Sequence, residues 1–245
     1  MANTDLQAGT ATPAPKNLVA RFIGIITAPR ATYESVAAHP KWFGMLALSA
    51  GLTALLVGGF LFTKVGQEAW IDAAVNAATA QGRSMTDQQI QGLERIAPFV
   101  GYGAIGFSVI GWPIVLAIIA GILFGVFNAA LGGNASFKQI FAVVVHAGPI
   151  GTLGQLVTMP LNYARGTMTS ATNLGMLTQA FLPDGSFAAR LLGMFDVFVL
   201  WQLLVLAIGL GVLYRRRTQP IAITFYTLYV VIAVIVAFLR RGAAA

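Results

Sequence analysis

Five long apolar stretches separated by polar segments make up most of this 245-residue chain. A helix crosses the hydrocarbon core of a bilayer with about 20 apolar residues, and it pairs every backbone polar group within the segment. All five stretches are long enough to cross: Phe43–Thr63, Phe99–Phe127, Ile140–Pro160, Leu191–Tyr214 and Ile221–Leu239. The pattern predicts an all-α fold, a polytopic membrane bundle of five transmembrane helices that occupies residues 42–245 as one domain.

The composition agrees with a membrane protein. The chain is 57% hydrophobic and 9% charged, whereas soluble domains carry about 25% charged residues. Cysteine is absent, which excludes disulfides, thiolate metal sites and cysteine nucleophiles. The net charge of +7 is densest at Arg215–Arg217, between the fourth and fifth stretches. A basic cluster at a membrane edge favours anionic lipid head groups, so we expect no nucleic-acid partner.

The residues before the first stretch are predicted to form a flexible tail and two short helices. Residues 1–16 show no periodicity and no signal-peptide pattern. In the first helix the apolar side chains share one face, namely Leu18, Phe22, Ile25 and Ile26. Pro29 is suited to open a second helix, which ends at His39 and Pro40.

Neither short helix is long enough to span, so residues 17–41 are predicted to lie parallel to the membrane on its cytoplasmic side. We expect this segment to pack beside the Arg215–Arg217 turn. The basic side chains of both segments are the candidate contacts for lipid head groups: Arg21, Arg30, Lys41, Arg215, Arg216 and Arg217.

Two polar connections are long enough to hold helices of their own. The insertion at residues 64–98 contains an apolar helical face that Gly82 ends, followed by the capping-box spacing of Thr86 and Gln89. It is predicted to form a helical hairpin standing on the bilayer. The connection Leu161–Arg190 is predicted to be a loop with one short helix near Leu174–Phe181.

The basic residues of the connections predict the orientation. With the N-terminus in the cytoplasm, the inner side holds eight Lys and Arg residues and the outer side seven, including Arg240 and Arg241. This orientation is favoured because it places the triple-arginine turn in the cytoplasm and because the first span usually dominates the orientation. Five spans then place the two termini on opposite sides of a cell membrane, here predicted to be a bacterial inner membrane.

Glycines in the second stretch match a nucleotide-binding motif by letter only. Residues Gly101–Gly106 read G-x-G-x-x-G, but the dinucleotide fingerprint also needs a preceding strand and an acidic residue about 20 positions later. Neither is present. We therefore interpret these glycines, together with Gly121 and Gly125, as sites of close helix packing.

Pro113 and two ionisable residues lie within the predicted spans. Pro113 predicts a kink, which is either structural or part of a transport site. Asp196 and His146 are functional candidates because intramembrane charge is costly. Their depths differ by about 15 Å, at 1.5 Å per residue, so they should not form a pair. A structural role is favoured for both, with Asp196 stabilised by a helix N-terminus and paired to Arg165 or Arg190.

The sequence contains no catalytic arrangement. Its two histidines lie on different segments, and Asp196 is the only acid within any predicted span. We therefore expect no enzyme activity, no cofactor and no metal.

Three ordered blocks resemble the Ypt-interacting-protein (Yip) family of multi-pass membrane proteins. They are Ile25–Arg30 with Pro40–Trp42, Leu131–Gln139, and Phe195–Gln202. The resemblance implies five spans and no catalytic residues. Eukaryotic members bind prenylated Rab-type GTPases, whereas bacterial members, which this Ala- and Gly-rich chain resembles, have no Rab system. The insertion at residues 64–98 is longer than the family pattern implies.

The sequence leaves two functions open. The first is a non-enzymatic protein that binds or organises other membrane proteins and lipids, and its membrane-protein partners include a second copy of itself as one option. The alternative is a small transporter, channel or lipid-moving protein that uses the Pro113 kink and Asp196. A polar cavity inside the bundle favours the alternative, and a tightly packed interior favours the first.

Overall fold

A computed structural model describes residues 14, 16–178, 181–183 and 186–239. Most of the predicted tail, 1–16, lies outside these residues, as do Arg240 and Arg241. The α-helices are α1 (Leu18–Thr27), α2 (Pro29–Ala38), α3 (Phe43–Thr53), α4 (Gly59–Leu61), α5 (Lys64–Thr79), α6 (Asp87–Gly106), α7 (Trp112–Phe124), α8 (Phe137–His146), α9 (Gly148–Arg165), α10 (Leu174–Thr178), α11 (Phe187–Leu192), α12 (Val197–Leu213) and α13 (Thr218–Leu239). Three π-helical segments interrupt them: η1 (Ala54–Gly58), η2 (Phe107–Gly111) and η3 (Gly125–Ala130).

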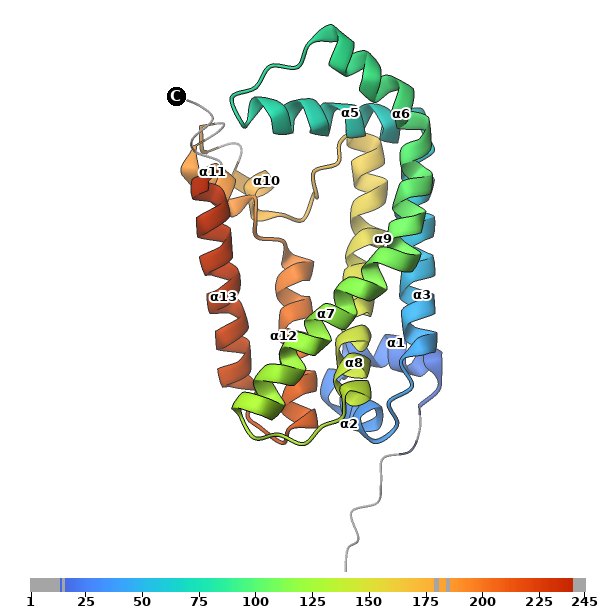
Figure 1. Ribbon diagram of the computed structural model, residues 1–245, viewed down its shortest axis with the longest axis vertical. Coiled ribbons are helices and arrows are strands. Elements are labelled where there is room, and N and C mark those ends of the chain that lie inside the picture. The colour runs from blue at the N-terminus through green and yellow to red at the C-terminus, as the bar shows by residue number, and fades with distance from the viewer. Residues whose placement is uncertain (1–13, 15, 179–180, 184–185, 240–245) are drawn as a thin grey trace, which may run out of the picture.

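Apolar helices run along the length of the bundle, which confirms the predicted all-α class (Figure 1). Four of them are long and apolar enough to cross a membrane: Phe43–Leu61, Asp87–Ala130, Phe137–Arg165 and Thr218–Leu239. The predicted span Leu191–Tyr214 is shorter than expected, because α12 begins only at Val197 and has 17 residues. At 1.5 Å per residue α12 is about 26 Å long, close to the thickness of the hydrocarbon core.

Helices α1 and α2 lie across one end of the bundle (Figure 1). Ile25 of α1 and Tyr33 and Val36 of α2 are fully buried in the core. The Tyr33 hydroxyl donates a hydrogen bond to the Val143 carbonyl in α8, at 3.3 Å. Much of the apolar face predicted for the bilayer interface therefore packs against the end of the bundle, while Leu18 stays exposed.

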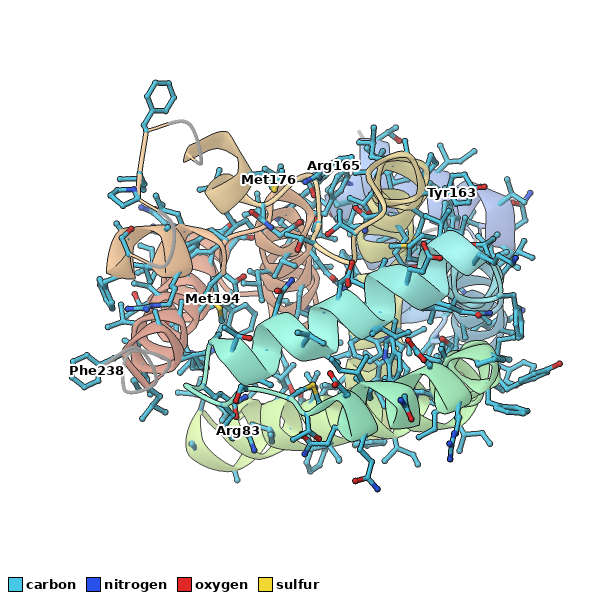
Figure 2. All side chains as sticks on the ribbon, turned by 90° about the horizontal axis from the view of Figure 1, so that it is seen from above. Arg83, Tyr163, Arg165, Met176, Met194 and Phe238 are labelled. Atoms are coloured by element: carbon cyan, nitrogen blue, oxygen red, sulfur yellow. The ribbon has the colours of Figure 1, made fainter. Side chains whose placement is uncertain are left out.

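The insertion contributes two helices, α5 and α6, that pack against each other. Helix α5 lies across the opposite end of the bundle (Figure 2), while α6 continues directly into the second span. The predicted capping box is present, with Thr86 and Gln89 each bonding the other's backbone. Gly82 has a φ of +70°, a left-handed conformation that favours glycine and ends the turn after α5.

Pro113 bends the second span, as predicted. Figure 1 shows the chain change direction between α6 and α7, and η2 lies at this point. Proline cannot donate the backbone hydrogen bond of a regular helix, so the preceding turn widens into a π-helical segment. The third span is also interrupted, at Ala147, and Pro149 follows in the first turn of α9.

The glycine predictions hold at one position only. A Cβ on Gly101 would lie 2.7 Å from the Phe62 ring, so this glycine permits close packing. A Cβ built on Gly103, Gly106, Gly121 or Gly125 would meet no described residue of another element within 4 Å, so these four glycines make no close helix contact within the described part of the chain. These four glycines lie on sides of the second span that face away from the other described helices.

Candidate intramembrane cavity

A cavity of about 480 Å³ lies between α3, the α6–α7 bend, α9 and α12. Its apolar wall includes Leu46, Phe107, Leu116, Val145 and Phe198. Polar side chains also line it: Ser49, Thr53, Ser108, Thr152, Gln155, Thr158, Ser170, Thr172, Asp196 and Gln202. Because the helices that line the cavity are otherwise apolar, this cluster of polar groups distinguishes it from ordinary core packing.

Helical periodicity brings the polar residues to the cavity. Thr152, Gln155 and Thr158 are spaced by three residues, so they share one side of α9. Glycines on α9 let the neighbouring helices approach. A Cβ on Gly154 would lie 2.8 Å from the Phe198 ring, and one on Gly151 would lie 3.3 Å from the amide oxygen of Gln202. Small residues on α9 thus allow close contact with α12 beside the cavity.

Some of the polar groups are satisfied by the protein and others are not. The Ser108 hydroxyl donates to the Ala104 carbonyl at 2.8 Å, and that of Thr152 donates to the Gly148 carbonyl at 3.3 Å. Ser49 Oγ and Gln155 Oε1 are buried and have no hydrogen-bond partner among the described residues. An unpaired buried polar atom costs about 1–3 kcal/mol. Both atoms line the cavity, so water or a polar ligand group there would satisfy them.

Asp196 lies at the end of the cavity, just before α12 rather than inside it. One carboxylate oxygen accepts hydrogen bonds from the Ser170 and Thr172 hydroxyls, both at 2.7 Å. The other oxygen caps the helix by accepting from the backbone N–H of Phe198 at 2.8 Å and of Val199 at 3.4 Å. Burial raises the pKa of Asp196, but the four hydrogen bonds together lower it by more. The pKa therefore lies below its ordinary value.

The sequence prediction for Asp196 is thus correct about the helix N-terminus and wrong about an arginine partner. Arg165 donates instead to the sulfur of Met176, at 3.1 Å, and Figure 2 shows these two residues side by side. The Nε of Arg190 is buried without a partner among the described residues. The hydroxyls of the 170–173 connection take the place of the arginine because this connection pairs with the residues before α12.

His146 is fully buried at the end of α8. Its Nδ1 lies 2.7 Å from the Ala142 carbonyl, and since a carbonyl only accepts, Nδ1 carries the proton. The remaining nitrogen, Nε2, has no partner among the described residues. His146 and Asp196 share no hydrogen-bond partner, and His146 does not line the cavity. The two ionisable residues do not form one site.

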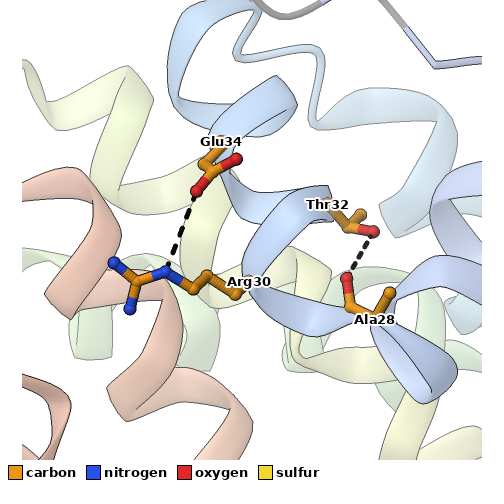
Figure 3. Close-up of polar contacts among 4 residues, drawn as sticks. All are labelled: Ala28, Arg30, Thr32 and Glu34. Atoms are coloured by element: carbon orange, nitrogen blue, oxygen red, sulfur yellow. Dashed lines mark hydrogen bonds and ion pairs between the residues drawn. The ribbon is translucent and has the colours of Figure 1, made fainter.

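The candidate head-group contacts divide into two groups. Arg21 is only 3% exposed and donates to the backbone carbonyls of Lys16 and Lys41, so its predicted contact with head groups is wrong. Burial follows from the packing of α1 onto the bundle. Arg30 is exposed and lies 3.8 Å from Glu34 (Figure 3), and Lys41 and Arg215–Arg217 are exposed as well.

Sequence reasoning missed most of the cavity residues, because single Ser, Thr and Gln residues are common in membrane helices. The available signal was their spacing. Ser49 and Thr53 are four residues apart, and the α9 residues 152, 155 and 158 are three apart. Polar residues repeated on one side of two predicted spans indicate that these sides face each other or a cavity.

The arrangement defines a polytopic helical membrane protein with a partly polar interior. Residues 23–239 match the Yip1 domain, and the chain belongs to this family. The chain is similar to a protein named Membrane protein YknW, from Bacillus subtilis (strain 168). The two are 24% identical over 210 residues, which cover 85% of this chain and 82% of the relative. No solved structure matches the chain. The resemblance inferred from the three sequence blocks is confirmed.

Proposed function

We propose that this Yip1-domain protein is a non-enzymatic membrane protein that binds lipids and membrane proteins, and that it holds an amphipathic constituent of the bilayer inside its bundle. The cavity of about 480 Å³ carries the proposal. Its size falls within the range of roughly 300–1,000 Å³ that is typical of small-molecule sites. Its lining has both an apolar and a polar part, which suits a ligand with the same division.

The unpaired atoms indicate where the polar part of the ligand binds. Ser49 Oγ and Gln155 Oε1 lie on facing helices, α3 and α9, and both are buried. A hydroxyl or amide of the ligand, or a water beside it, would restore their hydrogen bonds. The apolar part of the ligand would then contact Leu46, Leu116 and Phe198.

The proposed location is a bacterial cell membrane, with five spans and the N-terminus in the cytoplasm. The bacterial relative is itself named a membrane protein. Figure 1 supports an odd number of crossings, since α1 lies at one end of the bundle and α13 finishes at the other.

Cavity filling tests the binding proposal. Ala50 lines the cavity and is 8% exposed, whereas Ala47 on the same helix is exposed. The full chain is purified from bacterial membranes, and the lipids that remain bound are counted by native mass spectrometry. Ala50→Leu should lose the tightly retained ligand and Ala47→Leu should keep it. Equal retention by both variants, at unchanged thermal stability, would contradict the proposal.

A second function, movement of a lipid or other solute, is favoured by one specific observation. Phe107, the first residue of the π-helical bend, and Trp112, which follows the bend, line the same cavity as Asp196. A bend of this kind is suited to open and close a path. Vesicles containing the protein and a fluorescent phospholipid test this, since dithionite bleaches only the outer leaflet. Binding without accelerated bleaching favours the first function, and acceleration that Asp196→Asn abolishes in a folded protein favours the second.

A further inference from the structure

A second hollow lies on the outside of the bundle. It is bounded by the last turn of α7 and by η3 on one side, and by the first turns of α13 on the other. We call it the α7–α13 groove, and its volume is about 550 Å³. Its walls are mainly apolar, with Leu123, Phe127, Ile221 and Phe225 among them, and Arg216 and Arg217 line one end. It contains no acidic side chain. It shares no residue with the interior cavity.

The arginines lie where the spans end, in the turn between α12 and α13. Arg216 donates one hydrogen bond to the Leu131 carbonyl, at 2.8 Å, and thereby reaches across the end of the groove. A guanidinium has five N–H donors, so others remain for a ligand. Arg217 is exposed at the same end. The apolar wall runs along α13 from Pro220 to Leu228, about 12 Å at 1.5 Å per residue.

The backbone of this turn fixes the positions of the arginines. Helix α12 ends in a Schellman arrangement, in which Arg216 N–H donates to the Gly211 carbonyl and Arg215 N–H to that of Val212. Arg215 occupies the left-handed position, with a φ of +52°. Glycine is usual there, because a Cβ in this conformation lies too close to the following carbonyl oxygen. The two residues that follow Arg215, Arg216 and Arg217, are thereby held at the end of the groove.

We propose that the α7–α13 groove binds one anionic phospholipid, with an acyl chain along the groove and the phosphate against Arg216 and Arg217. The apolar wall alone does not select a ligand, since lipid tails are as apolar as the wall. Selection comes from the paired guanidiniums, which bind phosphate through charge-assisted hydrogen bonds at the level of the head groups. This goes beyond the proposed function, because it assigns a separate site with a stated ligand chemistry.

The test measures phosphatidylglycerol bound to the full chain, by native mass spectrometry from micelles that contain equal amounts of phosphatidylglycerol and phosphatidylcholine. We expect one phosphatidylglycerol to be retained in preference to phosphatidylcholine. Arg216→Gln with Arg217→Gln should weaken this retention about tenfold or more, because each arginine contributes about 1 kcal/mol of attraction. The charge-matched control, Arg30→Gln with Arg83→Gln, alters two exposed arginines outside the groove and should retain the lipid.

A second variant tests the groove itself. Thr224 is exposed within it, so Thr224→Phe should release the lipid while both arginines remain. If the control variant loses as much phosphatidylglycerol as the groove variant, general attraction to the charged surface explains the binding and the proposal is overturned. Equal retention of phosphatidylglycerol and phosphatidylcholine by the wild type would also overturn it. A dimer that Thr224→Phe dissociates would assign the groove to a second copy of the chain and also overturn it. Ala50→Leu should not affect this lipid, so failure here is distinguishable from failure of the cavity proposal.

Discussion

Replacing Asp196 tests how the end of the cavity is built. Asp196→Ala removes the helix cap, which costs about 1 kcal/mol, and two charge-assisted hydrogen bonds from Ser170 and Thr172. These bonds are partly exposed, so about 1 kcal/mol each is a reasonable value, and the total loss is about 3 kcal/mol. Asp196→Asn keeps a good cap, and the hydroxyls can rotate to accept from its amide. We expect this variant to lose only about 1 kcal/mol.

The assay is reversible unfolding in mixed micelles, followed by tryptophan fluorescence. A double-mutant cycle with Thr172→Val isolates the coupling, because once the carboxylate is gone the second substitution should cost little. Equal losses for Asp196→Asn and Asp196→Ala, or additive losses in the cycle, would refute the assigned contacts.

The difference in unfolding free energy between wild type and Asp196→Ala should depend on pH in one direction. The pKa of Asp196 is lower in the folded protein than its ordinary value of 3.8, so the unfolded state binds the proton more readily. The stabilisation is therefore complete above about pH 4 and is lost as the pH falls through the folded pKa. The gap between wild type and Asp196→Ala should be constant at neutral pH and shrink in acid.

Three further results are expected. Gly154→Val should cost about 1–3 kcal/mol in the same unfolding assay, because its Cβ would meet Phe198 at 2.8 Å, whereas Gly121→Val faces open space and should change stability little. Arg215→Gly should raise the stability by about 1 kcal/mol in neutral micelles, since the strained φ of +52° is relieved, and a loss of stability would contradict the Schellman assignment. Reporter fusions should place the two ends of the chain in different compartments, and a shared compartment would contradict five spans.

Local signals in the sequence predicted the elements well. The capping box at Thr86, the bend at Pro113 and the turn at Gly82 each depend on neighbouring residues only. Such features follow from the chain's own hydrogen bonding and steric limits, so they are readable without knowing the fold. The start of α12 could also have been placed at Asp196, because an acid before an apolar run is a strong helix cap.

The sequence did not predict which side of each helix packs against the others. In a bilayer the lipid-facing side is as apolar as the core, so hydrophobicity does not reveal which side is buried. Helix α13 illustrates this, since Ala233 and Ala237 are buried while Ile235 and Phe238 are exposed. Burial of Arg21 had the same cause, as nothing in the local pattern showed that α1 would cover the bundle rather than the membrane surface. The cavity depends on several helices at once, and only the spacing of its polar residues hinted at it.

The most direct test of the cavity is a crystal structure of the full chain grown from a lipid phase. We expect elongated density between α3, α9 and α12, with a polar end within hydrogen-bond distance of Ser49 and Gln155. A space closed by side chains, with Leu46 packed against Phe198 and no density between them, would contradict the proposal that the bundle holds an amphipathic ligand.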